Sequence, residues 1–391
     1  MGLRKFRVLL VMGLMLPLLL AGGGCKLGPW KLWNAYSARF IDDQGRVIDH
    51  ASASHTTSEG QAYALFFALA DNDRGTFDRV LTWTQANMAH GDLQTHLPGW
   101  LWGQNKDGVW TLLDANSASD ADVWMAYSLV EAGRLWNFPL YDHLGRQMLV
   151  QIAQHEVLDL PGFGVMLMPG PTGFTHARTP AVQAWTLNPS YLPLFVFERL
   201  AVVDPTGPWQ KIALDIPRLL RQSAVHGYAM DWVDYVPGDG FYPATTVASK
   251  STDVPQGSYD AIRVYLWAGM INRDNRVRDE ILDALPAMSI YLVDHDAPPE
   301  KVSDQGVPMA QDGPIGFSAA LLPYLHAFPH QEKTSARQLI RLSRQKDSVS
   351  GLYGRDQAYY DQNLTLFATG YLEGRFSFGL GGELKVEWTR A

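Results

Sequence analysis

Cysteine is nearly absent from this chain, whose 391 residues include only Cys25. A single cysteine excludes a disulfide within the chain and any zinc site built from paired cysteines. Charged residues are also sparse, at 18%, whereas 47% of the residues are hydrophobic. A chain of this composition can bury a large core, and its stability must come from packing.

Several catalytic signatures are missing as well. The sequence has no His-Glu-x-x-His motif, no phosphate-binding loop and no Gly-x-Ser-x-Gly turn, and its 11 histidines are scattered. These absences disfavour metal catalysis and serine hydrolysis, so we expect neither a metal nor a cofactor. The net charge of −8 argues against nucleic acid or an anionic membrane as partner and is compatible with a neutral polymer.

The first 23 residues have the pattern of a secretory signal peptide. Basic residues precede the apolar stretch 8–21, which is too short to span a membrane comfortably, and small residues follow it. We expect cleavage after Gly23 and export to the periplasm or the medium, with residues 24–391 forming one domain. Cys25 leaves a lipoprotein open, but Gly22 stands where such signals usually carry leucine, so this alternative is disfavoured.

Aromatic side chains are abundant, with 13 Trp, 16 Tyr and 16 Phe. Their number favours a ligand with flat apolar faces, such as a sugar ring. A tryptophan-rich helical core would explain the same composition.

The hydrophobic pattern predicts an all-α fold of twelve helices. Some segments are apolar throughout, and others are amphipathic. An apolar inner helix followed by an amphipathic outer one, six times over, describes an (α/α)6 barrel. The predicted helices are 30–38, 59–72, 74–90, 117–137, 140–155, 189–202, 207–223, 257–272, 275–293, 316–328, 332–346 and 356–372.

Short β-hairpins are expected in the loops of this barrel. Turn residues flank short apolar runs at 161–170, 231–243 and 375–388. In a toroid of helices, long loops gather at the ends and build a groove.

Glu59 opens a segment that carries no charge from Ala62 to Ala70. One interpretation is structural, because Thr56 and Glu59 have the spacing of a capping box. The other is chemical, because a carboxylic acid at the rim of a buried helix can have a raised pKa and protonate a substrate.

Asp120 and Asp122 fall in the first turn of another predicted helix, which Ser117 or Ser119 could cap. The helix dipole stabilises negative charge there by about 0.3–1 kcal/mol, so dipole compensation explains either aspartate alone. Two carboxylates at the start of a second buried helix also fit a shared catalytic rim.

Asp260 and Arg263 lie one helical turn apart in an otherwise apolar segment. Such a pair is usually ionic, which would depress the pKa of Asp260 and keep it ionised as a base. A neutral Glu59 and an ionised Asp260 would divide the work as glycosidic bond cleavage requires.

Five segments resemble family 8 of the glycoside hydrolases, and within it the endoglucanases encoded with bacterial cellulose synthase. The resemblance extends from about Trp30 to the C-terminus. The segments are "SEGQAYALFFALADND", "LPGWLWG" with "NSASDADVWMAYSLVEAGRLW", "NPSYLP", "SYDAIRVYLWAGM" and "GPIGFSAALLP".

The resemblance implies an (α/α)6 barrel with an open cleft and hydrolysis of β-1,4-glucan with inversion. Glu59 matches the general acid of the family, and Asp260 matches the general base of the subgroup that includes cellulases. Asp120 matches a residue often described as a nucleophile. Because inversion has no covalent intermediate, we interpret Asp120 as binding and polarising the sugar at the cleavage point. Whether Asp122 shares this role stays open.

The resemblance also supplies the expected sugar-binding residues, and stacking of the sugars on their aromatic rings would supply affinity. The matching positions are Trp102, Trp185, Tyr191, Tyr259 and Arg263.

The leading hypothesis is therefore an exported, monomeric endo-β-1,4-glucanase that trims nascent cellulose beside the synthase export machinery. Chitosan, xylan or mixed-linkage glucan is the alternative substrate for the same fold. A non-catalytic glucan-binding subunit of a synthase complex is the alternative from another class, although a binder has no need of three carboxylates.

Overall fold

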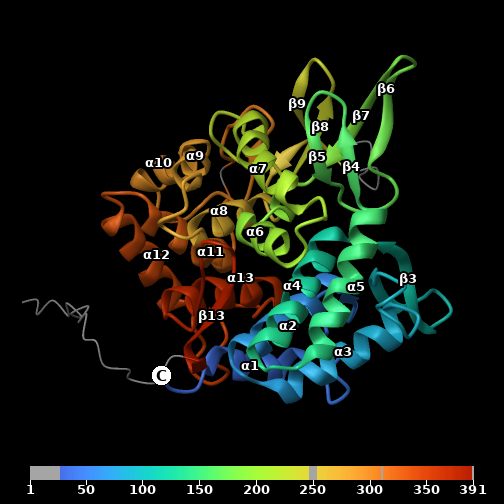
Figure 1. The fold of residues 1–391 in the computed structure, drawn as a ribbon. Coiled ribbons are helices and arrows are strands. Elements are labelled where there is room, and N and C mark those ends of the chain that lie inside the picture. The colour runs from blue at the N-terminus through green and yellow to red at the C-terminus, as the bar shows by residue number, and fades with distance from the viewer. Residues whose placement is uncertain (1–26, 246–252, 310, 390–391) are drawn as a thin grey trace, which may run out of the picture.

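The computed structural model of the protein describes residues 27–245, 253–309 and 311–389. The predicted signal peptide, its cleavage site and Cys25 lie outside these residues. The described part is mostly helical and carries several small sheets (Figure 1). None of its helices is long and apolar enough to cross a membrane.

The helices and strands have the following bounds. The α-helices are α1 (Lys31–Phe40), α2 (Ser58–Ala70), α3 (Arg74–Met88), α4 (Ser119–Leu135), α5 (Pro139–His155), α6 (Leu194–Val203), α7 (Trp209–Ser223), α8 (Ala261–Met270), α9 (Arg278–Asp283), α10 (Ala287–Asp294), α11 (Ile315–Ala327), α12 (Glu332–Arg344) and α13 (Tyr359–Leu372). The strands are β1 (Thr56–Thr57), β2 (Gly99–Gln104), β3 (Trp110–Ser117), β4 (Val157–Leu160), β5 (Gly164–Leu167), β6 (Thr175–Thr179), β7 (Val182–Leu187), β8 (Trp232–Val236), β9 (Gly240–Ala244), β10 (Gln256–Gly257), β11 (Val302–Ser303), β12 (Phe376–Phe378) and β13 (Leu384–Val386). Two short 3₁₀ helices, η1 (Pro189–Tyr191) and η2 (Glu387–Thr389), complete the set.

Six largely buried helices form the centre of the molecule, namely α2, α4, α6, α8, α11 and α13. All ten residues of α8 are buried, as are eleven of the thirteen in α11. Neighbouring central helices pack on one another, as α2 does on α4 and α8 does on α11. The apolar segments of the sequence therefore become the core, as their lack of a polar face requires.

Amphipathic helices cover this core from outside. Each packs against a central helix, as α3 does on α2, α5 on α4, α7 on α6 and α12 on α11. One face of α3 is buried, since Phe77, Val80, Leu81 and Thr84 all lie inside. The segment 275–293, predicted as one helix, is divided into α9 and α10 because Pro286 interrupts it.

Two sheets flank one end of the central helices. A three-stranded sheet, β1-β2-β3, pairs the residues just before α2 with an aromatic hairpin. A four-stranded antiparallel sheet, β6-β7-β8-β9, projects from the helical body (Figure 1). The predicted strands in 161–170, 231–243 and 375–388 are confirmed by β5, β8 with β9, and β12 with β13. The β2–β3 and β6–β7 hairpins were not predicted.

Candidate active site

Glu59 lies at the start of α2, and the structure shows that it is not part of a capping box. The side chain of Thr57 caps α2 by accepting a hydrogen bond from the Gly60 N–H at 3.1 Å. Thr56 belongs to β1, where its hydroxyl donates to the carbonyl of Val47 at 2.6 Å. The predicted Thr56–Glu59 box is wrong because the helix begins one residue later than that pairing requires. The other twelve residues of α2 are buried, so Glu59 is its one partly exposed position.

Asp120 lies in the first turn of α4 and is 3% exposed. The N-cap residue is Ala118, and no side chain caps the helix, so the predicted cap by Ser117 or Ser119 is wrong. One oxygen of Asp120 accepts a hydrogen bond from the N–H of Ala121 at 2.8 Å. The other, Oδ2, lies 3.5 Å from Nη1 of Arg263.

Asp260 is the N-cap residue of α8, but its side chain makes no capping bond. It accepts a hydrogen bond from Arg263 Nη2 at 2.6 Å instead. This contact confirms the ion pair that the three-residue spacing predicted.

Arg263 joins all three predicted carboxylates, which come from three different helices. Its Nη1 donates to Glu59 and lies 3.5 Å from Asp120, while its Nη2 binds Asp260. The guanidinium is 3% exposed and also donates to the hydroxyl of Ser190 at 3.0 Å. The buried, planar guanidinium of Arg263 has fixed donor directions and thus sets the positions of the acids.

These residues line a cavity of about 170 Å³. Its lining consists of Thr57, Ser58, Glu59, Trp100, Ala118, Asp120, Tyr191, Asp260 and Arg263. Residues from positions 57 to 263 therefore meet at one opening, at the amino-terminal ends of α2, α4 and α8.

A larger cavity of about 360 Å³ adjoins the first and shares Trp100, Ala118 and Tyr191 with it. Phe174 and Trp232, which precede β6 and begin β8, also line it. Their rings are nearly parallel, at 7°, with centroids 6.0 Å apart. The carboxylates thus open onto a space with an aromatic wall.

Burial raises the pKa of Asp120 to about 7. Burial first, and then the negative charges of Asp231 and Asp120, raise the pKa of Asp260 well above its ordinary value. The depressed pKa predicted for Asp260 is wrong, because Arg263 is one cation shared among several acids and does not offset their burial and mutual repulsion. Both acids therefore keep their protons up to a higher pH than isolated carboxylates do.

Comparison with known proteins gives the family. A model described as "Glycosyl hydrolases family 8" matches residues 16–374. The chain belongs to glycosyl hydrolase family 8. It is 42% identical over 375 residues to "Endoglucanase" of Xanthomonas axonopodis pv. citri (strain 306), covering 96% of this chain and 93% of that protein.

Other relatives agree. "Endoglucanase" of Escherichia coli (strain K12) is 40% identical over 361 residues, covering 92% of this chain and 91% of the relative. The crystal structure of endo-1,4-D-glucanase from Vibrio fischeri ES114 superposes with a TM-score of 0.81 at 34% identity, covering 92% of this chain and all of that one. The predicted family is confirmed, and the chain is a glycosidase.

In this glycosidase, Asp122 does not line the carboxylate cavity. It is fully buried behind Asp120 and faces Glu156, whose Oε1 accepts a hydrogen bond from the hydroxyl of Ser117. Burial raises the pKa of Asp122 well above its ordinary value and that of Glu156 to about 8. Asp122 therefore belongs to a second, buried acid pair.

The predicted aromatic residues are placed differently from one another. Tyr191 lines both cavities. Trp102 stacks on Trp110 with ring centroids 5.1 Å apart, and Trp185 is 7% exposed. Tyr259 is 45% exposed beside Asp260, and its hydroxyl donates to Glu300.

Sequence reasoning missed Trp100 and Trp232 as cavity residues. On a regular strand Trp100 and Trp102 would share a face, but the pairing of β2 with β3 shifts register between them, and only Trp100 lines the carboxylate cavity. Among the described residues, no group of three or more His, Cys, Asp or Glu could hold a metal ion.

Proposed function

We propose that this protein is an endo-β-1,4-glucanase that cleaves its substrate with inversion. The observation that carries the proposal is the convergence of Glu59, Asp120 and Asp260 on one guanidinium, at the mouth of an aromatic-walled cleft. Relatives at 37–42% identity are endoglucanases, which supports this specificity.

The three carboxylates take distinct roles. Glu59, the single acidic residue of α2, donates a proton to the leaving oxygen, and Asp260 activates a water on the opposite face of the sugar. In the structure Arg263 binds both acids, Glu59 through Nη1 and Asp260 through Nη2. Glu59 must carry a proton when substrate is bound, so we expect Arg263 to give up that contact in the complex.

Asp120 binds the sugar at the cleavage point. It lies beside Arg263 within the same cavity, where an acceptor oxygen can bind a sugar hydroxyl. The aromatic wall then extends the binding site, with Tyr191 at the junction of the two cavities. Trp102, Trp185 and Tyr259 remain proposed contacts for sugars farther along the chain.

The helical body is proposed to be a complete (α/α)6 barrel. Six central helices alternate along the chain with outer partners, and α1 closes the set by packing against α13. Residues 24–391 would then be one catalytic domain that acts as a monomer.

The proposed setting is outside the cytoplasm, where the enzyme trims nascent glucan next to the cellulose export machinery. The signal-like pattern of residues 1–23 supports export, with lipidation of Cys25 as the disfavoured alternative. The acidic net charge suits a neutral polymer substrate.

The first experiment compares substrates. Release of reducing sugar from carboxymethylcellulose should exceed release from chitosan, xylan or mixed-linkage glucan. Proton NMR of the first products should show the α-anomer, as inversion of a β-linkage requires. Faster cleavage of xylan or chitosan would assign another substrate, and a β-anomer would refute inversion.

The second experiment tests the acid. Glu59→Gln cannot donate a proton, so turnover on a cello-oligosaccharide should fall by about 10²–10⁴-fold. An aryl glucoside whose leaving group needs no protonation should recover part of the rate. Asp260→Asn should recover on neither substrate. A folded Glu59→Gln with near wild-type activity would sink the assignment, and activity lost on all substrates alike would not identify an acid.

A further inference from the structure

Asp260 occupies the N-cap position of α8 without performing the usual task of an N-cap aspartate. Such a side chain normally accepts a hydrogen bond from a backbone N–H in the first turn of its own helix. In this protein the carboxylate of Asp260 binds Arg263 instead. The open N–H groups at the start of α8 must be satisfied by another acceptor.

That acceptor is Asp231, which lies just ahead of β8 and about thirty residues before the helix. Its Oδ1 accepts hydrogen bonds from the N–H groups of Ser258 at 2.7 Å, Asp260 at 3.1 Å and Ala261 at 2.8 Å. One carboxylate oxygen therefore holds the backbone on both sides of the proposed base.

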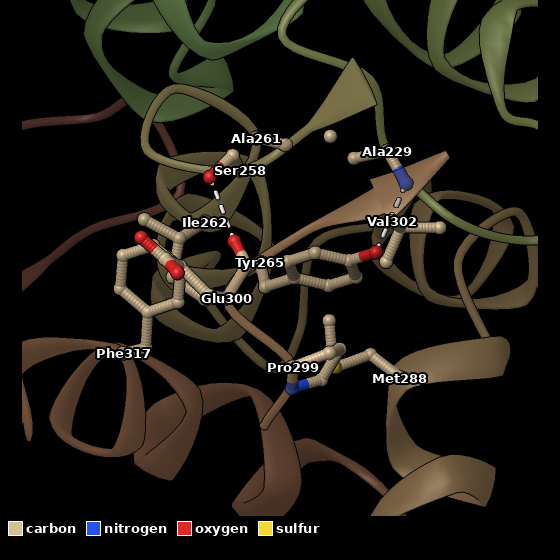
Figure 2. A pocket seen from close by; sticks show the side chains of 11 residues that line it. Ala229, Ser258, Ala261, Ile262, Tyr265, Met288, Pro299, Glu300, Val302 and Phe317 are labelled. Carbon is tan, nitrogen blue, oxygen red and sulfur yellow. Dashed lines mark hydrogen bonds between the residues drawn. The ribbon is translucent and has the colours of Figure 1, made fainter. Parts of the chain in front are cut away.

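The backbone around Asp231 is itself anchored. The N–H of Asp231 donates to the carbonyl of Gln256 at 2.9 Å. Two residues earlier, the N–H of Ala229 donates to the hydroxyl of Tyr265 on α8 at 2.9 Å, as Figure 2 shows.

The segment that leads into α8 is held on its other side too. The hydroxyl of Ser258 donates to the carbonyl of Glu300 at 2.7 Å (Figure 2). A small apolar cavity of about 10 Å³ lies behind it, so there is little room for Ser258 or Ala261 to shift. The start of α8 is thus fixed from two directions.

We propose that Asp231 is a positioning residue for the base of the hydrolytic reaction. It caps α8 from a segment about thirty residues earlier in the chain, which frees the carboxylate of Asp260 for water activation, and its negative charge keeps that base strong. This inference rests on the proposed function, because it takes Asp260 as the base.

Asp231 acts within a set of groups that surround Asp260. Positive charge comes from Arg263, and negative charge comes from Asp231, from Asp120 on α4 and from Glu59 across the guanidinium. The hydroxyls of Tyr191 and Tyr360 also face this cluster. Removing one of the negative neighbours should lower the pKa of Asp260, because less repulsion then opposes its ionisation.

Two variants separate the capping role from the charge. Asp231→Asn keeps an oxygen that can accept the three hydrogen bonds but carries no charge. Asp231→Ala removes both. Asp239→Asn, an exposed position in the β8–β9 turn, serves as the matched control. Steady-state kinetics on a soluble cello-oligosaccharide from pH 4 to 9 and thermal melting give the readouts.

For Asp231→Asn, the acidic limb of kcat/KM should move to lower pH by about one unit, since the base ionises more readily. For Asp231→Ala, kcat should fall by about 10–100-fold with little change in KM, because the base is misplaced. Asp239→Asn should behave as wild type. If Asp231→Ala does not fold, the pH profile of Asp231→Asn still decides.

The inference would be overturned if the acidic limb of the kcat/KM profile of Asp231→Asn stayed where it is in wild type. It would also be overturned if Asp231→Ala lowered the melting temperature and left kcat unchanged. Asp260→Asn distinguishes this failure from failure of the proposed function. If Asp260→Asn is inactive while both Asp231 variants behave as wild type, only the inference fails. If Asp260→Asn retains wild-type activity, Asp260 is not the base, and the proposed function and the inference both fail.

Discussion

Replacing Glu156 by glutamine should make the stability of this protein less dependent on pH. Glu156 is fully buried next to Asp122, and burial raises its pKa to about 8 from an ordinary 4.5. The folded protein therefore keeps a proton on Glu156 at pH values where the unfolded chain has lost it. Between these two pKa values, each rise of one pH unit lowers the free energy of unfolding by about 1.4 kcal/mol for this group.

The same stability is fully present below about pH 4.5 and is lost as the pH rises towards 8. From pH 5 to 7.5 the loss from Glu156 amounts to about 3 kcal/mol, a large fraction of the 5–15 kcal/mol typical of a folded domain. Glu156→Gln does not titrate. Its amide oxygen can still accept the hydrogen bond from Ser117, and its amide can donate to Asp122.

The assay is urea unfolding followed by tryptophan fluorescence at half-unit steps from pH 5 to 7.5. The slope of unfolding free energy against pH should be shallower in Glu156→Gln by about 1.4 kcal/mol per unit. Asp122 still titrates in the variant, so some slope remains. Glu332→Gln, at an exposed position on α12, should run parallel to wild type. Parallel lines for Glu156→Gln as well would refute the reasoning, because they would mean that the folded protein does not hold this proton.

Three other substitutions or treatments test the structure. Trp100→Ala removes a ring that lines both cavities, so KM for a long cello-oligosaccharide should rise about 3–10-fold while turnover of a small aryl glucoside stays unchanged. Equal losses of activity on both substrates would instead mean that Trp100 takes part in the chemistry. Gly257→Ala would bring a Cβ within 2.1 Å of the Ala229 carbonyl oxygen, so the free energy of unfolding measured with denaturant should fall by about 1–3 kcal/mol and kcat should also fall. Gly28→Ala, which has open space around its Cβ, should change neither quantity. Chelation with EDTA should leave hydrolysis unchanged, and a loss that one divalent ion restores would contradict a metal-free mechanism.

Sequence patterns identified the helices well where apolar and amphipathic segments alternate. The segments without charge became the central helices, because a helix with no polar face must be buried. Errors occurred at helix ends, since Thr56 and Thr57 are equally good caps by type and only the pairing of β1 with β2 assigns Thr56 to a strand. Strand β6 is almost entirely exposed and shows no alternation of apolar and polar residues, so its hairpin with β7 was not predicted.

By itself, then, the sequence determined which side chains we propose for the chemistry. Motifs around Glu59, Asp120 and Asp260 are local, so residue type, spacing and family resemblance were sufficient to select them. Only the tertiary structure decided their environment. Burial reversed the expected direction of the Asp260 pKa, and the cap of α8 proved to be Asp231, which no spacing rule connects to the helix. Electrostatics and hydrogen bonding depend on distances through space, and those distances exist only once segments far apart in the chain have packed together.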